Sequence, residues 1–307
     1  MRVAAIDIGT NTLLLLIAES ITGRPDDLVP RVEFARIVRL GEGVDRTRVF
    51  KQEAIARTLA ALEEATALIR SHAVTNIAVV GTSAMRDASG AEPILAFVRS
   101  QLGADVRVIS GDEEARLTFD GALSGLQIRG SVAVFDIGGG STEIVYGEVT
   151  TAGTTIVYGK SYDIGSVRLT ERFIAHDPPQ ADERANVEQA IEAALKDAPH
   201  HQADVVIGIA GTITTLAAVS LEMSSYDASR IHGYLMSTET LRHVTHRLSQ
   251  MPFETRSAVR GLEPKRADVI VAGGLIAQGV MRHLQTAALR VSDRGVRWGL
   301  ARAICCA

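Results

Sequence analysis

Two stretches of sequence decide the fold: AIDIGTNTLLLLIAE at residues 5–19 and VFDIGGGSTEIVYGE at residues 134–148. Each consists of an apolar run, the tripeptide Asp-Ile-Gly, a small polar turn and a second apolar run. Short apolar runs bounded by turn residues are typical of buried strands, so each stretch predicts a hairpin. The two stretches begin about 130 residues apart. This spacing indicates an internal repeat of one supersecondary unit and therefore two domains with similar cores.

Apolar strands and amphipathic helices alternate along the rest of the chain. We expect further strands at 77–80, 106–109 and 205–209, and helices at 53–70, 92–102, from 113 onwards, at 182–198 and at 267–282. This alternation predicts an α/β fold with mostly parallel sheets. A candidate linker, LSGLQIRG at 123–130, divides the chain into domains 1–126 and 127–307. The last segment, 291–303, predicts a strand, a turn and a helix that could pack back on the first domain.

Composition and charge exclude several classes of protein. The 307 residues carry a net charge of −4, which is unfavourable for a general nucleic-acid-binding surface. The longest apolar run, 13–18, is too short to span a bilayer, and the first residues predict a strand rather than a signal peptide. Cys305 and Cys306 are adjacent and cannot staple separate parts of the fold. We therefore expect a cytoplasmic protein without nucleic-acid or membrane partners.

Three turns rich in Gly, Ser and Thr suggest phosphate binding. They are 9–12, 138–142 and the pair Gly211-Thr212, which a helix follows. Such turns present backbone N–H groups and hydroxyls at a common point, which suits a phosphate. Asp7 and Asp136 lie where the strands end, and carboxylates at this place can hold a metal. A plain hairpin turn explains one copy equally well, but the repetition favours an anion site.

Two further motifs have both a structural and a catalytic interpretation. SGDEEAR at 110–116 predicts the start of a helix, because Ser or Asp caps a helix and acidic residues in the first turn oppose its dipole. The same carboxylates could act in general acid–base catalysis. Arg86 could hold two phosphate oxygens, or it could form a surface ion pair with Asp87 or Asp112.

Seven segments in order resemble the exopolyphosphatase/guanosine pentaphosphate phosphatase (Ppx/GppA) family of the actin/Hsp70/sugar-kinase superfamily. They are AIDIGTNT (5–12), GTSAMRDA (81–88), ISGDEEARLTF (109–119), VFDIGGGSTEI (134–144), IGSVRLTERF (164–173), GIAGTITTLA (208–217) and VSDRGVRWG (291–299). The resemblance covers about residues 1–300, without the C-terminal helical extension of longer members. It implies two RNase H-like, actin-like domains with an interdomain cleft, and a homodimer.

The resemblance also assigns roles to residues. Glu114 matches the family's catalytic base, with Glu113 as its local competitor, and Arg86 matches an arginine that contacts phosphate. The expected phosphate-binding residues are Asn11, Thr12, Arg86, Gly138, Gly139, Gly140, Ser141, Thr142, Gly211 and Thr212. Mg²⁺ or Mn²⁺ is expected at a carboxylate site formed by Glu114, Asp136, Glu143 and Asp7. Lys160, Arg168 and Arg266 are weaker candidates for contacts to the rest of an anionic chain.

The expected activity is removal of the terminal phosphate of inorganic polyphosphate by water. The first alternative is hydrolysis of guanosine pentaphosphate. Two others come from different classes: a kinase that uses an acceptor, and a sensor that binds a phosphate chain without turnover. The absence of a nucleophile elbow and of a Walker P-loop excludes the common competing motifs.

Overall fold

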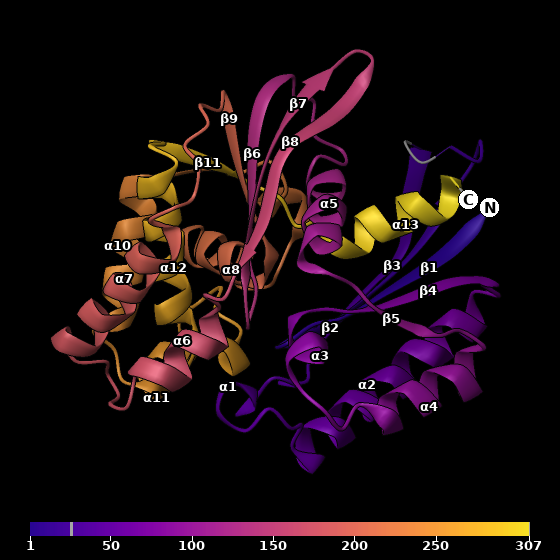
Figure 1. The fold of residues 1–307 in the computed structure, drawn as a ribbon, viewed down its shortest axis with the longest axis horizontal. Coiled ribbons are helices and arrows are strands. Elements are labelled where there is room, and N and C mark those ends of the chain that lie inside the picture. The colour runs from indigo at the N-terminus through magenta and orange to yellow at the C-terminus, as the bar shows by residue number, and fades with distance from the viewer. Residues whose placement is uncertain (25–26, 307) are drawn as a thin grey trace. The chain divides into compact units, whose positions relative to one another are not determined.

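The computed structural model describes residues 1–24 and 27–306 and confirms an α/β fold (Figure 1). The chain forms two compact units. Unit 1 consists of Met1–Ser124 and Gly295–Ala307, and unit 2 consists of Gly125–Arg294. The first boundary lies inside the expected linker at 123–130. The last helix groups with unit 1, in line with the expected packing of this segment on the first domain, although the expected range of the second domain extended to residue 307.

Unit 1 is built on a five-stranded sheet with the order β3-β2-β1-β4-β5. Its strands are β1 (Arg2–Ile8), β2 (Thr12–Ser20), β3 (Leu28–Ile37), β4 (Asn76–Gly81) and β5 (Val106–Val108). β1, β4 and β5 run parallel, whereas β2 and β3 are antiparallel to their neighbours. The carboxyl ends of the parallel strands therefore share one edge of the sheet, which is where ligands bind in open α/β sheets.

Helices cover both faces of this sheet (Figure 1). The helices of unit 1 are α1 (Val44–Thr47), α2 (Gln52–Ser71), α3 (Ser83–Asp87), α4 (Glu92–Leu102), α5 (Gly111–Ala122) and α13 (Val296–Cys306). Successive side chains of a strand point to opposite faces. Ala4, Ile6 and Ile8 accordingly join the core beneath α2 and α4. Val3 and Ala5 join the core that contains residues of α5 and α13, and Asp7 shares their face.

α5 and α13 approach each other closely because two glycines face the partner helix. A Cβ atom at Gly299 would lie 2.1 Å from the carbonyl oxygen of Leu117, and one at Gly121 would lie 2.0 Å from that of Gly295. Trp298, fully buried on the same helix, belongs to the core that α13 shares with the sheet. The contact thus requires the absence of side chains at these two positions.

Unit 2 is built on a six-stranded sheet with the order β10-β11-β9-β6-β7-β8. Its strands are β6 (Gly130–Ile137), β7 (Thr142–Thr150), β8 (Gly153–Tyr162), β9 (Val205–Ile209), β10 (Leu235–Ser237) and β11 (Ala288–Val291). β6, β9 and β11 are parallel, and β6-β7-β8 is an antiparallel meander. From β8 to β11, this repeats the order and directions of the five strands of unit 1, which confirms the internal repeat.

The helices of unit 2 are α6 (Ser166–Phe173), α7 (Ala181–Leu195), α8 (Ala210–Ser220), α9 (Ala228–Ile231), α10 (Thr238–Ser249), α11 (Phe253–Ser257), the 3₁₀ turn η2 (Pro264–Arg266) and α12 (Ile270–His283). One apolar core joins α6, α7, α8, α10 and α12 to the sheet. α7 begins with a capping box between Gln180 and Glu183. Among the described residues, no helix is both long and apolar enough to cross a membrane.

Most expected elements are confirmed within a few residues, and the structure adds others that were not expected, among them α6, α10 and β10. The strands β3 and β8 were not expected, because their exposed outer positions are polar or Gly-rich and hide the alternation. The pair Gly211-Thr212 lies in the first turn of α8 rather than in a separate turn before it. β11 ends at Val291, where the last expected strand begins.

We expect the Gly299→Ala substitution to destabilise unit 1 by about 1–3 kcal/mol, because its methyl group must displace the Leu117 backbone of α5. Ala303→Ser adds one heavy atom to the exposed face of the same helix and should change stability by less than about 1 kcal/mol. Urea unfolding of both variants measures the difference. Equal midpoints for the two would contradict the close packing of α5 and α13.

Candidate functional site

The turn between β6 and β7 has its carbonyl groups bound on one side by α6. The carbonyl of Gly138 accepts hydrogen bonds from the backbone N–H and the hydroxyl of Ser166, at 2.9 and 3.2 Å. The carbonyl of Gly139 accepts from the N–H groups of residues 167 and 168 at 2.9 and 3.0 Å. The carbonyl of Gly140 accepts from Nε of Arg168 at 2.6 Å. Three consecutive carbonyls therefore point toward α6.

The N–H groups of the same peptide units must then point away from α6. A trans peptide is planar, and its N–H and C=O point in opposite directions. The N–H groups of Gly139, Gly140 and Ser141 thus face the opposite side of the turn. None of the three has a hydrogen-bond partner among the residues that the structure describes. A row of such N–H groups is an anion-binding nest.

Gly165 and Arg168 hold this turn, and the sequence had not assigned them this role. A Cβ atom at Gly165 would lie 2.3 Å from the carbonyl oxygen of Gly139. Arg168 is buried, and the sequence suggested for it only a contact with an anionic chain. Its 28-residue separation from Gly140 explains why no local pattern reveals the bond.

Asp136 and Glu143 form a pair of buried carboxylates on either side of this turn. They are directly opposite each other in the antiparallel register of β6 and β7, so their side chains share one face of the sheet. Ser161 donates a hydrogen bond of 2.6 Å to Oε1 of Glu143. Like charges at such a position destabilise a sheet unless a cation offsets them. The oxygen donors fit Mg²⁺, which usually takes one or two carboxylates and completes its shell with water and phosphate.

The third expected turn lies beside an arginine. A Cβ atom at Gly211 would lie 2.2–2.4 Å from Nη1, Cζ and Nη2 of Arg266, so this guanidinium packs flat on the glycine. Burial lowers the pKa of Arg266. Thr212 donates a hydrogen bond of 3.3 Å to the carbonyl of Ile137, which ties the start of α8 to the end of β6. The second and third turns of the sequence therefore lie together in unit 2.

The turn between β1 and β2 in unit 1 has a similar pattern of backbone hydrogen bonds. Gly9 donates to the carbonyl of Thr12 at 3.1 Å, as Gly138 donates to Ser141 at 3.0 Å in unit 2. The carbonyl of Asn11 is bound by the N–H groups of residues 38 and 39, both at 3.0 Å. The side chain of Asn11 is buried, and its Nδ2 has no partner among the described residues. An unpaired buried amide is costly and points to a bound acceptor.

Arg86 and Glu114 form an ion pair at the carboxyl edge of the same sheet. Nη1 of Arg86 lies 2.6 Å from Oε2 of Glu114 and 3.0 Å from the carbonyl oxygen of Ile109. The two side chains are 23% and 8% exposed. Nε and Nη2 of Arg86 have no partner in the described part of the chain. These two nitrogens form a fork of the kind that can bind two phosphate oxygens at once. The partner is thus Glu114, and neither Asp87 nor Asp112.

The start of α5 distinguishes its two glutamates. Ser110 caps the helix by accepting the N–H of Glu113 at 3.2 Å, which confirms the structural interpretation of this motif. The side chain of Glu113 is partly exposed and forms an ion pair with Arg107. Glu114 is buried, on the side that faces Arg86. The helix cap and the candidate catalytic base are therefore compatible, because Ser110 forms the cap and Glu114 is the candidate base.

The four carboxylates expected to bind a metal are divided between the units. Asp7 and Glu114 lie in unit 1, and Asp136 and Glu143 lie in unit 2. Within residues 1–24 and 27–306, no group of three or more His, Cys, Asp or Glu is arranged to hold a metal ion. The Asp136–Glu143 pair is the part of the expected set that the structure brings together.

Comparisons with known proteins agree with these motifs. A sequence model of the Ppx/GppA phosphatase family matches residues 17–304. "Exopolyphosphatase 2" of Mycobacterium tuberculosis is 41% identical over 98% of this chain and 97% of its own length. A guanosine-5'-triphosphate,3'-diphosphate pyrophosphatase of Vibrio atlanticus is 30% identical over 97% of this chain and 58% of its own. The crystal structure of the Aquifex aeolicus member of the Ppx/GppA family has a TM-score of 0.82 at 34% identity, covering 99% of this chain and 97% of that one.

We expect Gly165→Ala to weaken binding of tripolyphosphate at least tenfold, since its methyl group displaces the Gly139 peptide and with it the row of N–H groups. Gly279→Ala is the matched control, because the three atoms nearest to its Cβ all belong to the side chain of Ile191, the first of them 2.5 Å away. Calorimetric titration measures both, and circular dichroism checks the fold. Arg168→Gln, which removes one bond to the turn, provides a milder second variant. Unchanged affinity in both turn variants would exclude this turn as the anion site.

Proposed function

Because the chain belongs to the Ppx/GppA phosphatase family, we propose that it is an exopolyphosphatase, which releases orthophosphate from the end of inorganic polyphosphate. The chain is a hydrolase that acts on phosphoric anhydrides. The choice of polyphosphate is supported by the 41% identity to an exopolyphosphatase over nearly the full length of both chains.

Guanosine pentaphosphate is the second candidate substrate. The Vibrio atlanticus relative, named for this class of substrate, is 30% identical over nearly all of this chain. Both substrates end in a phosphoric anhydride, and the fork of Arg86 suits either terminus. They differ in the remainder of the molecule, so a direct comparison of rates distinguishes them.

The arrangement that carries the proposed chemistry is the Arg86–Glu114 pair. Phosphoryl transfer requires mainly positioning and electrostatic stabilisation rather than covalent chemistry. The free fork of Arg86 binds two oxygens of the terminal phosphate, and Nη1 of the same group fixes the carboxylate of Glu114. The carboxylate then lies next to the reacting phosphate. There it orients a water molecule and accepts its proton as the oxygen attacks phosphorus, while the bond from this phosphorus to the bridging oxygen breaks and the shortened phosphate chain leaves with that oxygen.

Each unit offers its own donors to a chain of phosphates. The N–H groups of Gly139, Gly140 and Ser141 bind phosphate oxygens without a cost of reorganisation, because α6 fixes their carbonyls. The Nδ2 of Asn11 supplies a further donor. These contacts recognise the negative charge of the phosphate chain and involve no nucleobase. The proposal therefore needs no nucleotide pocket.

Asp136 and Glu143 would hold a divalent cation, Mg²⁺ or Mn²⁺. When bound, such a cation neutralises the negative charge that develops on the phosphate oxygens. It would also offset the repulsion between the two opposed carboxylates. Contributions of Asp7 and Glu114 to this site, a homodimer and a cytoplasmic location stay predictions.

The substrate proposal predicts rapid release of orthophosphate from medium-chain polyphosphate in Mg²⁺ buffer, with no acceptor present. Release from guanosine pentaphosphate, measured in parallel, should be slower, and EDTA should stop both. Faster release from the nucleotide would reverse the choice of substrate. Release only with an acceptor indicates a kinase, and binding without release indicates a sensor. Undiminished release in EDTA would contradict the metal site.

The mechanism predicts that Glu114→Gln lowers kcat by about 10²–10⁴ while tripolyphosphate still binds, because the variant loses the proton acceptor and keeps the anion contacts. Glu113→Gln, one residue earlier and partly exposed, should retain nearly full activity. Thermal unfolding of both variants checks that the loss is chemical, since a broken buried pair also costs stability. Equal kcat for Glu114→Gln and the parent chain would remove Glu114 from this role.

A further inference from the structure

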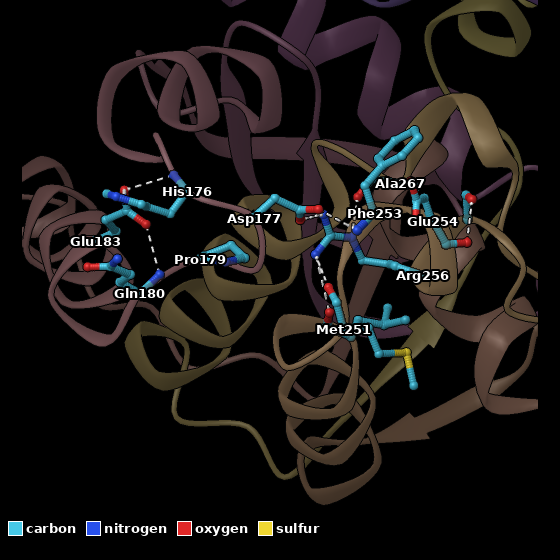
Figure 2. A network of polar contacts seen from close by, with 12 residues as sticks. His176, Asp177, Pro179, Gln180, Glu183, Met251, Phe253, Glu254, Arg256 and Ala267 are labelled. Atoms are coloured by element: carbon cyan, nitrogen blue, oxygen red, sulfur yellow. Dashed lines mark hydrogen bonds and ion pairs between the residues drawn. The ribbon is translucent and has the colours of Figure 1, made fainter.

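Arg256, on the short helix α11, has a buried guanidinium in which every nitrogen donates a hydrogen bond (Figure 2). Nε donates to the carbonyl of Ala267 at 2.6 Å. Nη1 donates to the carbonyls of Met251 and Leu248 at 2.9 and 3.4 Å. Nη2 donates to Oδ1 of Asp177 at 2.8 Å. Burial of a charge is costly unless it is fully paired, so this arrangement is fixed in one geometry.

Asp177 closes the network from the loop before α7. Its Oδ1 accepts the hydrogen bond from the guanidinium of Arg256. Its Oδ2 accepts a hydrogen bond of 2.5 Å from the backbone N–H of Phe253, the first residue of α11 (Figure 2). The Asp177 side chain is 42% exposed, whereas that of Arg256 is 3% exposed. The network therefore has a buried cation and an accessible anion. The anion can be changed with a smaller effect on the core.

The network ends next to Arg266. Ala267, whose carbonyl is bound by Arg256, follows Arg266 directly in the chain. The N–H of Arg266 donates to the carbonyl of Glu263 at 2.8 Å, and its carbonyl accepts from Val269 at 3.1 Å. The backbone on both sides of Arg266 is thus held. Its side chain leaves from a fixed turn, and the guanidinium packs on Gly211 at the start of α8.

An arginine in this place stands beside two other features that attract anions. α8 has 11 residues, and its first turn carries the partial positive charge of the helix N-terminus. Thr212 in that turn donates a hydrogen bond to the carbonyl of Ile137 at the end of β6. The row of N–H groups of residues 139–141 begins just after this point in the chain. A shift of Arg266 would therefore change how a phosphate chain continues beyond that row.

We propose that Arg256 and Asp177 are positioning residues, which hold the Ala267 carbonyl and thereby keep Arg266 over Gly211 to bind the phosphate chain. The proposal rests on the proposed phosphatase function. It assigns to neither residue a contact with the substrate. It predicts an effect on the affinity for the anionic chain and none on the chemical step.

The test compares Asp177→Asn and Arg256→Lys with the parent chain by steady-state release of orthophosphate from polyphosphate. Asp177→Asn should raise KM about three- to tenfold with kcat nearly unchanged, because a charged hydrogen bond is weakened. Glu239→Gln is the matched control, since it breaks an exposed ion pair with Arg242 on the neighbouring α10. It should leave KM unchanged. An unchanged KM in Asp177→Asn would contradict the positioning role. A loss of kcat and thermal stability without a change in KM would likewise show that the network only stabilises the fold.

A double-mutant cycle with Arg266→Gln separates positioning from general weakening. If Asp177 acts through Arg266, Asp177→Asn should raise KM no further in the Arg266→Gln background. An additive rise would overturn the proposal. Tripolyphosphate titration of the same four proteins gives a second readout that does not depend on turnover. If the parent chain releases no phosphate, the proposed function fails, while the cycle in binding affinity still decides whether Asp177 acts through Arg266.

Discussion

The planar trans peptide in two short turns is the constraint on which the candidate site depends. Since C=O and N–H of one peptide unit point in opposite directions, binding the carbonyls on one side leaves the N–H groups on the other. In unit 2, the start of α6 and Nε of Arg168 bind three successive carbonyls from Gly138 to Gly140. In unit 1, residues after β3 bind the carbonyl of Asn11. Buried backbone groups must be paired, so the fold decides which side of each turn remains for an anion.

The same chain segment thus appears twice with different side chains around it. In unit 2, the turn carries glycines and is flanked by the Asp136–Glu143 pair, which suits a cation and close approach of phosphate. In unit 1, the corresponding edge of the sheet carries Arg86 and Glu114 on segments that follow β4 and β5. Repetition of the backbone supplied two turns of the same design, while divergence of the side chains placed Glu114, the proposed proton acceptor, in unit 1 and the paired carboxylates in unit 2.

Residues beyond the turns explain how firmly the arrangement is held. Gly165 permits α6 to touch the turn, and Gly299 permits α13 to touch α5, because any side chain at either position would overlap backbone atoms. Arg256 plays a comparable part around Ala267, with four acceptors for one buried cation. Gly165 and Gly299 belong to segments that resemble the family, but none of the three residues has a proposed catalytic role. Each determines where a motif residue is placed.

By itself, the sequence determined the repeated hairpins, the alternation of helices and strands, the Ser110 cap and the identity of Glu114 and Arg86 as candidates. The first three follow from local patterns of apolar, glycine and acidic residues, which act over a few positions of the chain, whereas the choice of Glu114 and Arg86 came from the resemblance to the Ppx/GppA family. Only the tertiary structure decided that Arg86 pairs with Glu114 across 28 residues, that Arg168 holds Gly140, and that Arg266 packs on Gly211. Such contacts join residues far apart in the chain, and no local pattern encodes the register, helix packing and burial that bring them together.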